Sequence, residues 1–98
     1  MVKYHHGQLL TEVLALLQQR GPLTRGEIAA ELHISRQLSG AVISRLNRSS
    51  PERTKRIYVK AWCWHAEGER TYPRPIYDVC DTIERLDAPR PSSPDEEL

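Results

Sequence analysis

The chain has 98 residues, a formal net charge of +1, no phenylalanine and two cysteines. This length allows one small domain with a modest core, and no segment approaches the roughly 20 apolar residues of a transmembrane helix. The stretch MVKYHHGQLL lacks a signal-peptide core, and two cysteines are too few for a disulfide framework. We therefore expect a cytoplasmic protein.

The small net charge hides an uneven distribution of charge along the chain. Residues 1–80 contain 12 basic and 7 acidic residues, whereas residues 81–98 contain 2 basic and 6 acidic ones. Within 36–60 there are 7 basic residues and a single acid, Glu52. A basic centre with an acidic tail suggests an anionic partner for the centre, although a solvated charged surface would explain the same counts.

The first half of the chain predicts helices. In 8–20, QLLTEVLALLQQR, the apolar residues recur at helical spacing, and Gly21-Pro22 ends the pattern. Thr24 and Glu27 then form an S/T-x-x-E capping box, so a short second helix is expected to begin after Thr24. Its buried face would consist of Ile28, Ala29 and Leu32.

A third helix is predicted over roughly 36–48, with Ser35 as its N-cap. The spacing places Leu38, Ala41, Val42 and Leu46 toward the core. The opposite side would present Arg36, Gln37, Gly40, Ser44 and Asn47, with Ser39 and Ile43 on the flanks. His33 and Ile34 separate this helix from the second one. Histidine tolerates a left-handed backbone better than most residues, so a tight turn is possible there.

The second half of the chain changes to a strand pattern. Residues 56–64, RIYVKAWCW, alternate between two faces, 65–69 read as a hairpin turn, and 70–79 form the returning strand. Pro73 and Pro75 lack ladder donors, which makes the returning segment an edge strand or an irregular arm. Residues 81–98 are acidic and rich in Pro and Ser, and we expect most of this tail to be disordered. The predicted fold class is α+β, with one domain over 1–80.

The region 24–48 fits a helix-turn-helix. Ala29 is small where the two helices would cross, Ile34 supplies an apolar residue in the turn, and Ser35 caps the second helix. With the basic loop and the hairpin, residues 8–80 resemble the winged helix-turn-helix family. More narrowly, IYVKAW, the turn containing GER, and YPRPIY look like small DNA-binding proteins of bacteriophages and prophages. That resemblance implies a transcriptional regulator, more often a repressor, acting as a homodimer on double-stranded DNA in a bacterial host cell, at the nucleoid.

Arginine pairs bidentately with guanine and glutamine with adenine, so Arg36 and Gln37 are the leading candidates for base contacts. Basic residues of the loop and hairpin, Arg74 among them, would contact phosphates. The positions of Arg45 and Arg48 near the end of the helix are equally explained by the helix dipole, which favours cations there. Lys60 and Arg70 have an alternative role, which is to protect an edge strand from aggregation. The candidate DNA-binding residues are Thr24, Ser35, Arg36, Gln37, Ser39, Gly40, Ser44, Arg45, Arg48, Arg53, Lys55, Arg56, Lys60, His65 and Arg70.

Other readings of the sequence remain open. Tyr58, Trp62, Trp64 and Tyr72 would complete the core, form a dimer contact or stack on bases. Cys63, His65 and Cys80 fall one short of a zinc site, so no metal or cofactor is expected, and no catalytic motif is found. The rival function is a protein-interaction module, such as a phage-encoded inhibitor of a host defence or transcription complex. Gly40 on a solvent face would be explained by close approach of DNA.

Overall fold

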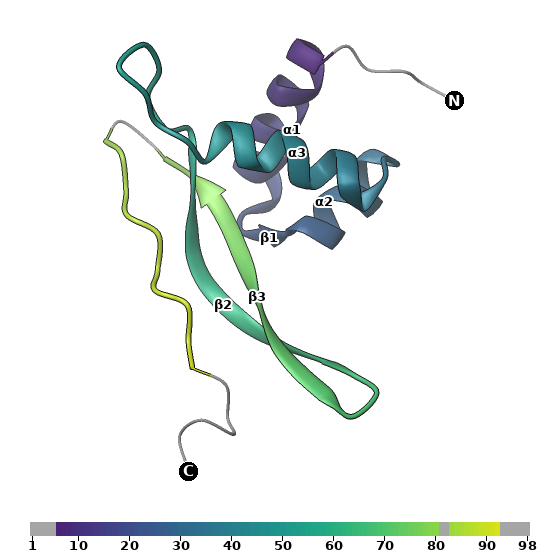
Figure 1. Cartoon of the computed structure of the whole chain (residues 1–98). Coiled ribbons are helices and arrows are strands. Elements are labelled where there is room, and N and C mark those ends of the chain that lie inside the picture. Colours follow the sequence, from purple (N-terminus) through teal and green to yellow (C-terminus); the bar gives the residue numbers. More distant parts are fainter. Residues whose placement is uncertain (1–5, 81–82, 93–98) are drawn as a thin grey trace.

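The computed structural model describes residues 6–80 and 83–92 of the chain. It is a small α+β domain in which three helices gather at one end and a long hairpin projects away from them (Figure 1). The elements are α1 His6–Arg20, β1 Leu23–Thr24, α2 Arg25–Leu32, α3 Arg36–Leu46, β2 Ile57–Glu67 and β3 Arg70–Val79.

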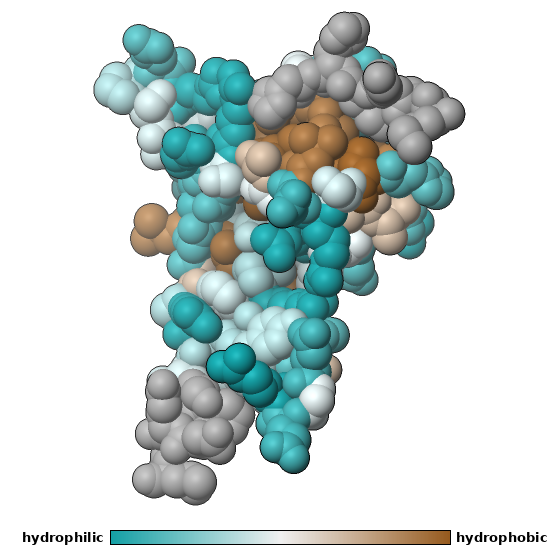
Figure 2. Space-filling model, turned by 45° about the vertical axis from the view of Figure 1, so that its right-hand side comes forward, coloured by the Kyte–Doolittle hydropathy of each residue, from teal (hydrophilic) through white to brown (hydrophobic). Residues whose placement is uncertain are grey.

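The core lies where the three helices meet the base of the hairpin. Leu9, Val13 and Leu17 of α1 are almost completely buried, as their spacing of four residues predicts. They form one cluster with buried residues of β1, α2, α3 and β2, which are Leu23, Ile28, Val42, Ile43, Leu46 and Ile57. Hydrophilic side chains dominate the hairpin arm, whereas hydrophobic surface on the face drawn in Figure 2 gathers toward the helical end.

The predicted starts of α2 and α3 and the residues that cap them are confirmed. Thr24 Oγ1 accepts the Glu27 backbone N–H at 3.2 Å, and Glu27 Oε1 accepts the Thr24 N–H at 2.8 Å, which completes the capping box. His33 ends α2 in the left-handed conformation with φ 56° and ψ 44°. Ser35 Oγ then accepts the Leu38 N–H at 3.0 Å and starts α3. Asn47 caps α3, so the helix ends two residues earlier than predicted.

The inward face of α3 differs from the prediction. Leu38 is 40% exposed and Ala41 is also exposed, whereas Ser39, Val42, Ile43 and Leu46 are buried. The observed stripe still follows helical spacing, but it is rotated relative to the predicted one. The prediction placed Leu38 in the core because leucine is more hydrophobic than serine, whereas the buried stripe begins at Ser39.

The sheet contains three antiparallel strands in the order β1-β3-β2. The two-residue strand β1 was not predicted; it pairs Leu23 with Tyr77 and Thr24 with Ile76. The prediction that 70–79 forms an edge strand is therefore wrong near residue 77. At Pro73 and Pro75, which pair with Trp64 and Trp62 of β2, β3 has a partner strand on one side only, because the two-residue β1 does not extend that far. The N–H groups that the prolines lack are therefore not needed for a second ladder.

The hairpin is longer and more irregular than predicted. The strands extend to Glu67 and Arg70, which pair across the turn, and Gly68 occupies the left-handed region at φ 63°. A bulge lies between Val59 and Ala61. A bulge inserts one residue and resets the alternation of faces. Ile57 and Val59 therefore face the core, whereas Ala61, which strict alternation would place on the same face, is exposed.

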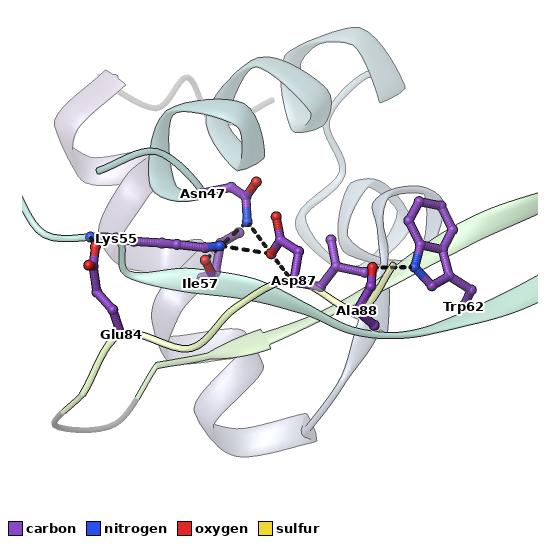
Figure 3. Close-up of polar contacts among 8 residues, drawn as sticks. Asn47, Lys55, Ile57, Trp62, Glu84, Asp87 and Ala88 are labelled. Carbon is purple, nitrogen blue, oxygen red and sulfur yellow. Dashed lines mark hydrogen bonds and ion pairs between the residues drawn. The ribbon is translucent and has the colours of Figure 1, made fainter. Parts of the chain in front are cut away.

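Where the structure describes the acidic tail, at residues 83–92, it contains no helix or strand and lies against the hairpin, and the prediction that most of 81–98 is disordered stays a prediction. This segment runs alongside β2 on the edge that β3 does not occupy (Figure 1). The Ala88 N–H donates to the Val59 carbonyl at 2.8 Å, and Trp62 Nε1 donates to the Ala88 carbonyl at 2.9 Å (Figure 3). The tail thus satisfies main-chain groups of an exposed edge strand. The remainder of the predicted tail, 81–82 and 93–98, lies outside the described residues.

Within the described ranges, none of the helices has the length and hydrophobicity needed to cross a membrane.

Candidate nucleic-acid interface

The helix pair α2–α3 provides the frame of the candidate interface. Ala29 is 4% exposed where the helices approach, and Ile34 packs against the core from the turn. The left-handed residue His33 and the cap Ser35 reverse the chain within three residues, 33–35. This leaves one long side of α3 uncovered by other elements of the described chain (Figure 1).

The uncovered side of α3 is centred on Gln37, Ala41, Ser44 and Arg48, all of which are exposed. Of the predicted face, Gln37 and Ser44 lie here and Gly40 lies at its border. Ala41 was expected in the core, so sequence reasoning missed it as a surface residue. The missing signal was the rotation of the apolar stripe described above.

Two residues assigned to this face lie elsewhere. Ser39 is completely buried, and its hydroxyl donates to the Arg25 carbonyl at 3.0 Å, so it fastens α3 to α2 and is removed from the candidate DNA contacts. Asn47 is half-buried and donates its amide to the Ile57 carbonyl at 3.1 Å. It therefore joins the end of α3 to β2.

Arginines gather at both ends of α3. At the start of the helix, Arg36 shares a hollow of about 260 Å³ with Arg25 and Arg74. At the end, Arg45 and Arg48 line a second hollow of about 450 Å³ with Arg53 and a single acid, Glu52. Arg25 was absent from the predicted site, because it belongs to α2 and only the fold brings it to α3.

The side chain of Arg25 explains Gly40. A Cβ built on Gly40 would lie 3.1 Å from Cδ and 3.2 Å from Nη1 of Arg25, which is closer than nearly all real contacts of this kind. Gly40 thus has a close neighbour within the free protein, the exposed side chain of Arg25. That DNA also comes close to Gly40 stays a prediction.

Two lysines that were predicted to contact phosphates pair instead with acidic side chains of the same chain. The Lys55 side chain is 13% exposed, and its Nζ lies 2.9 Å from Asp87 of the tail. Lys60 Nζ lies 3.6 Å from Asp78 Oδ2 in an ion pair that is half exposed. Lys55 is therefore withdrawn from the candidate interface, whereas Lys60 remains accessible because an exposed pair of this kind is weak.

The remaining predicted residues fall into three places. Thr24 and Ser35 hold the two helix caps with their hydroxyl oxygens. Arg56 is exposed next to the base of the hairpin, where its N–H donates to the Leu46 carbonyl. His65 and Arg70 lie near the far end of the hairpin, away from α3, and His65 packs edge-on against Tyr72 with ring centroids 5.3 Å apart.

The aromatic residues do not form one cluster. Trp62 is covered by the tail, Trp64 is 45% exposed, and Tyr72 accepts a hydrogen bond from Arg74 Nη2 at 3.0 Å. Both cysteines are free and half-buried. Among the residues that the structure describes, no three His, Cys, Asp or Glu side chains are grouped so that they could hold a metal.

No protein-family model, no curated protein and no solved structure matches this chain.

Proposed function

We propose that the chain is a winged helix-turn-helix protein that binds double-stranded DNA through α3 and regulates transcription. In this account α2 and α3 are the helix-turn-helix, and the hairpin β2–β3 is the wing. The fold is compatible with this proposal: three helices are followed by a hairpin, and a tight three-residue turn joins α2 to α3. The family resemblance of IYVKAW and YPRPIY supports it independently.

The observation that carries the proposal is the pattern of charge along α3. Arginines lie at both ends of the helix, and the side between them is uncharged and rich in small residues. The nine residue steps from Arg36 to Arg45 correspond to about 14 Å of helix, and the DNA major groove is about 12 Å wide. A helix lying in the groove would therefore place its two ends near opposite phosphate backbones.

The uncharged side of α3 suits contact with base edges. Gln37 offers the amide that pairs bidentately with adenine, Ser44 offers a hydroxyl, and the Ala41 methyl suits the methyl group of thymine. The small side chains at 40, 41 and 44 would allow the helix backbone to come close to the groove floor. The structure turns Arg36 toward Gly26 of α2, which favours a phosphate over a base as its contact.

The experiment that tests this proposal is selection of bound sequences from a random DNA pool, followed by affinity measurements on the selected duplex. Gln37→Ala should weaken binding to that duplex by about 1–3 kcal/mol and relax the preference at one position. Gln19→Ala is the matched control, because Gln19 is an exposed glutamine of α1. Selection that enriches no sequence would contradict specific recognition by α3.

We infer further that the protein acts as a homodimer on a palindromic site with half-sites about one helical turn apart. This inference rests on the family resemblance. Sedimentation of the protein with and without the selected duplex measures the stoichiometry, and one protomer on a non-repeated site would oppose it.

A second candidate function is binding to another protein, as an inhibitor of a host complex would do. The observation that favours it is three large apolar side chains in solvent: Trp64, Ile83 and Leu86 are 45%, 75% and 93% exposed. A stable complex with a host protein that Leu86→Ser and Trp64→Ser abolish, together with no measurable DNA affinity at low salt, would favour this function over the first.

A further inference from the structure

The hollow at the start of α3 brings three positive side chains together from three elements. Arg25 is the first residue of α2, Arg36 is the first residue of α3, and Arg74 belongs to β3. All three line one hollow of about 260 Å³, whose remaining walls are Thr24, Gly26, Tyr72, Pro73, Pro75 and Tyr77. No carboxylate of the described residues lines it.

The arginines are held in this arrangement by specific contacts. Arg36 lies across α2 at Gly26, where a Cβ would be 3.4 Å from Arg36 Nη2, and Arg25 lies across α3 at Gly40. Arg74 donates to the Tyr72 hydroxyl at 3.0 Å, and this hydroxyl in turn donates to Glu67 at 2.8 Å. Gly40 thus leaves room for Arg25, Arg36 lies at contact distance from Gly26, and a tyrosine orients the third arginine.

Among the described residues none of the three arginines forms a direct ion pair, and Arg74 reaches the Glu67 carboxylate only through the Tyr72 hydroxyl. In the described ranges 6–80 and 83–92, the ion pairs involve Arg20, Lys55 and Lys60 and none of the three arginines in the hollow. The Glu27 carboxylate keeps its negative charge in the capping box, where it accepts the N–H of Thr24, a wall of the hollow. Three guanidinium groups that line one hollow without direct ion pairs repel one another, and an anion placed between them would reduce that repulsion.

The size and the chemistry of the hollow restrict the anion. Its volume lies below the roughly 300–1,000 Å³ of pockets that enclose drug-sized ligands. Guanidinium groups bind phosphate oxygens with two parallel hydrogen bonds, and the N-terminal turn of α2 adds the positive end of a helix dipole. Burial raises the pKa of Tyr77, which outweighs the opposite effect of Arg25, so its hydroxyl stays protonated and able to donate.

We propose that the hollow formed by Arg25, Arg36 and Arg74 binds a single phosphate group. The phosphate belongs either to the DNA backbone, in which case the hollow ties the wing and both helices of the helix-turn-helix to one strand, or to a free phosphate ligand. Only the first source rests on the function proposed above.

The first arm of the test uses free inorganic phosphate and needs no DNA. Phosphate is titrated into the isotope-labelled full chain at constant ionic strength, and amide and arginine Nε–H signals are followed by NMR. We expect saturable shifts at residues 24–26, 36 and 72–77 that chloride does not reproduce. Arg36→Gln with Arg74→Gln should abolish them, whereas Arg20→Gln, which removes one arginine charge at an exposed pair on α1, should not.

The second arm measures affinity for DNA in the same variants. If the phosphate is that of DNA, Arg74→Gln should reduce affinity about tenfold for selected and scrambled duplexes alike. It should also lower the salt slope by about 0.9. Phosphate-specific shifts together with unchanged DNA affinity would support the hollow as a site for free phosphate. Phosphate-specific shifts in a protein that does not bind DNA at all would support the same site and would contradict the proposed function. Thermal melts exclude unfolded variants, and Arg25→Gln supplies a substitute if Arg74→Gln does not fold.

The proposal is overturned if neither arm responds: phosphate produces no more shift than chloride, and a folded Arg74→Gln protein binds DNA as tightly as the wild type does, with the same salt slope.

Discussion

The Asp87 carboxylate accepts the backbone N–H of Val59 at 2.7 Å and thereby fastens the tail near the start of β2. The same oxygen accepts hydrogen bonds from Asn47 Nδ2 at 3.1 Å and Lys55 Nζ at 2.9 Å (Figure 3). One side chain thus joins the end of α3, the loop, the hairpin and the tail. Without it, the backbone N–H of Val59 would lose its acceptor.

We therefore expect Asp87→Asn to lower the free energy of unfolding. The change keeps the size of the side chain but removes the charge that three donors share, and because the site is partly exposed the loss should be about 1 kcal/mol. Urea unfolding measures it. Glu69→Gln, at the exposed hairpin turn, is the control for charge alone, and equal stability of the two variants would mean that Asp87 holds nothing.

Asp87 also predicts a dependence of stability on pH. Burial would raise the pKa of Asp87, but the hydrogen bonds from Lys55, Val59 and Asn47 together outweigh it and hold the pKa below its ordinary value of 3.8. Its contribution is therefore complete at pH values above 3.8 and is lost as the pH falls through the lower pKa of the folded state. Unfolding curves from pH 7 to pH 2 should show a weaker acid dependence in Asp87→Asn than in the wild type. Identical slopes would contradict this.

Gly40 and Arg25 should be energetically coupled. Alanine normally stabilises a helix interior by about 1 kcal/mol relative to glycine. At position 40 the added Cβ meets the Arg25 side chain, which is exposed and must shift by a few tenths of an ångström. Gly40→Ala should therefore gain less in the wild type than in an Arg25→Ala background. A double-mutant cycle by urea unfolding measures this difference, and an equal gain in both backgrounds would refute the contact.

Two serines of α3 should separate stability from binding. Ser39→Ala removes the hydrogen bond that the buried Ser39 hydroxyl donates to the Arg25 carbonyl and should cost about 1–2 kcal/mol of stability. Ser44 is exposed, so Ser44→Ala should leave stability within about 0.5 kcal/mol and reduce affinity for the selected DNA. Thermal melts and binding titrations on both variants check the pair. The reverse pattern would mean that the assignment of the two sides of α3 is wrong.

The local features of the fold were predictable from sequence, because neighbouring residues determine them. The capping box of Thr24 and Glu27, the left-handed turn at His33 and the Ser35 cap all depend on side chains within three residues of the backbone they satisfy. The hairpin followed from a change of period and from Gly68 in its turn.

The features that the sequence did not reveal depend on distant partners. The bulge after Val59 reversed the expected faces of β2, and the pairing of β1 exists only because β3 lies beside it. The path of the tail along β2 depends on the contacts of Asp87 and Ala88 with the main chain of Val59, which its acidic, Pro-rich composition does not indicate. Likewise, the convergence of Arg25 and Arg74 on Arg36 requires three elements to be folded together.

The measurement that tests the central account most directly is the affinity for the selected DNA duplex as a function of salt. Arginine clusters at both ends of α3 should neutralise several phosphates, so log K should fall against log[salt] with a slope of about −3 to −5. An affinity that does not change with salt, or no binding at low salt, would contradict the proposal that α3 lies in the major groove.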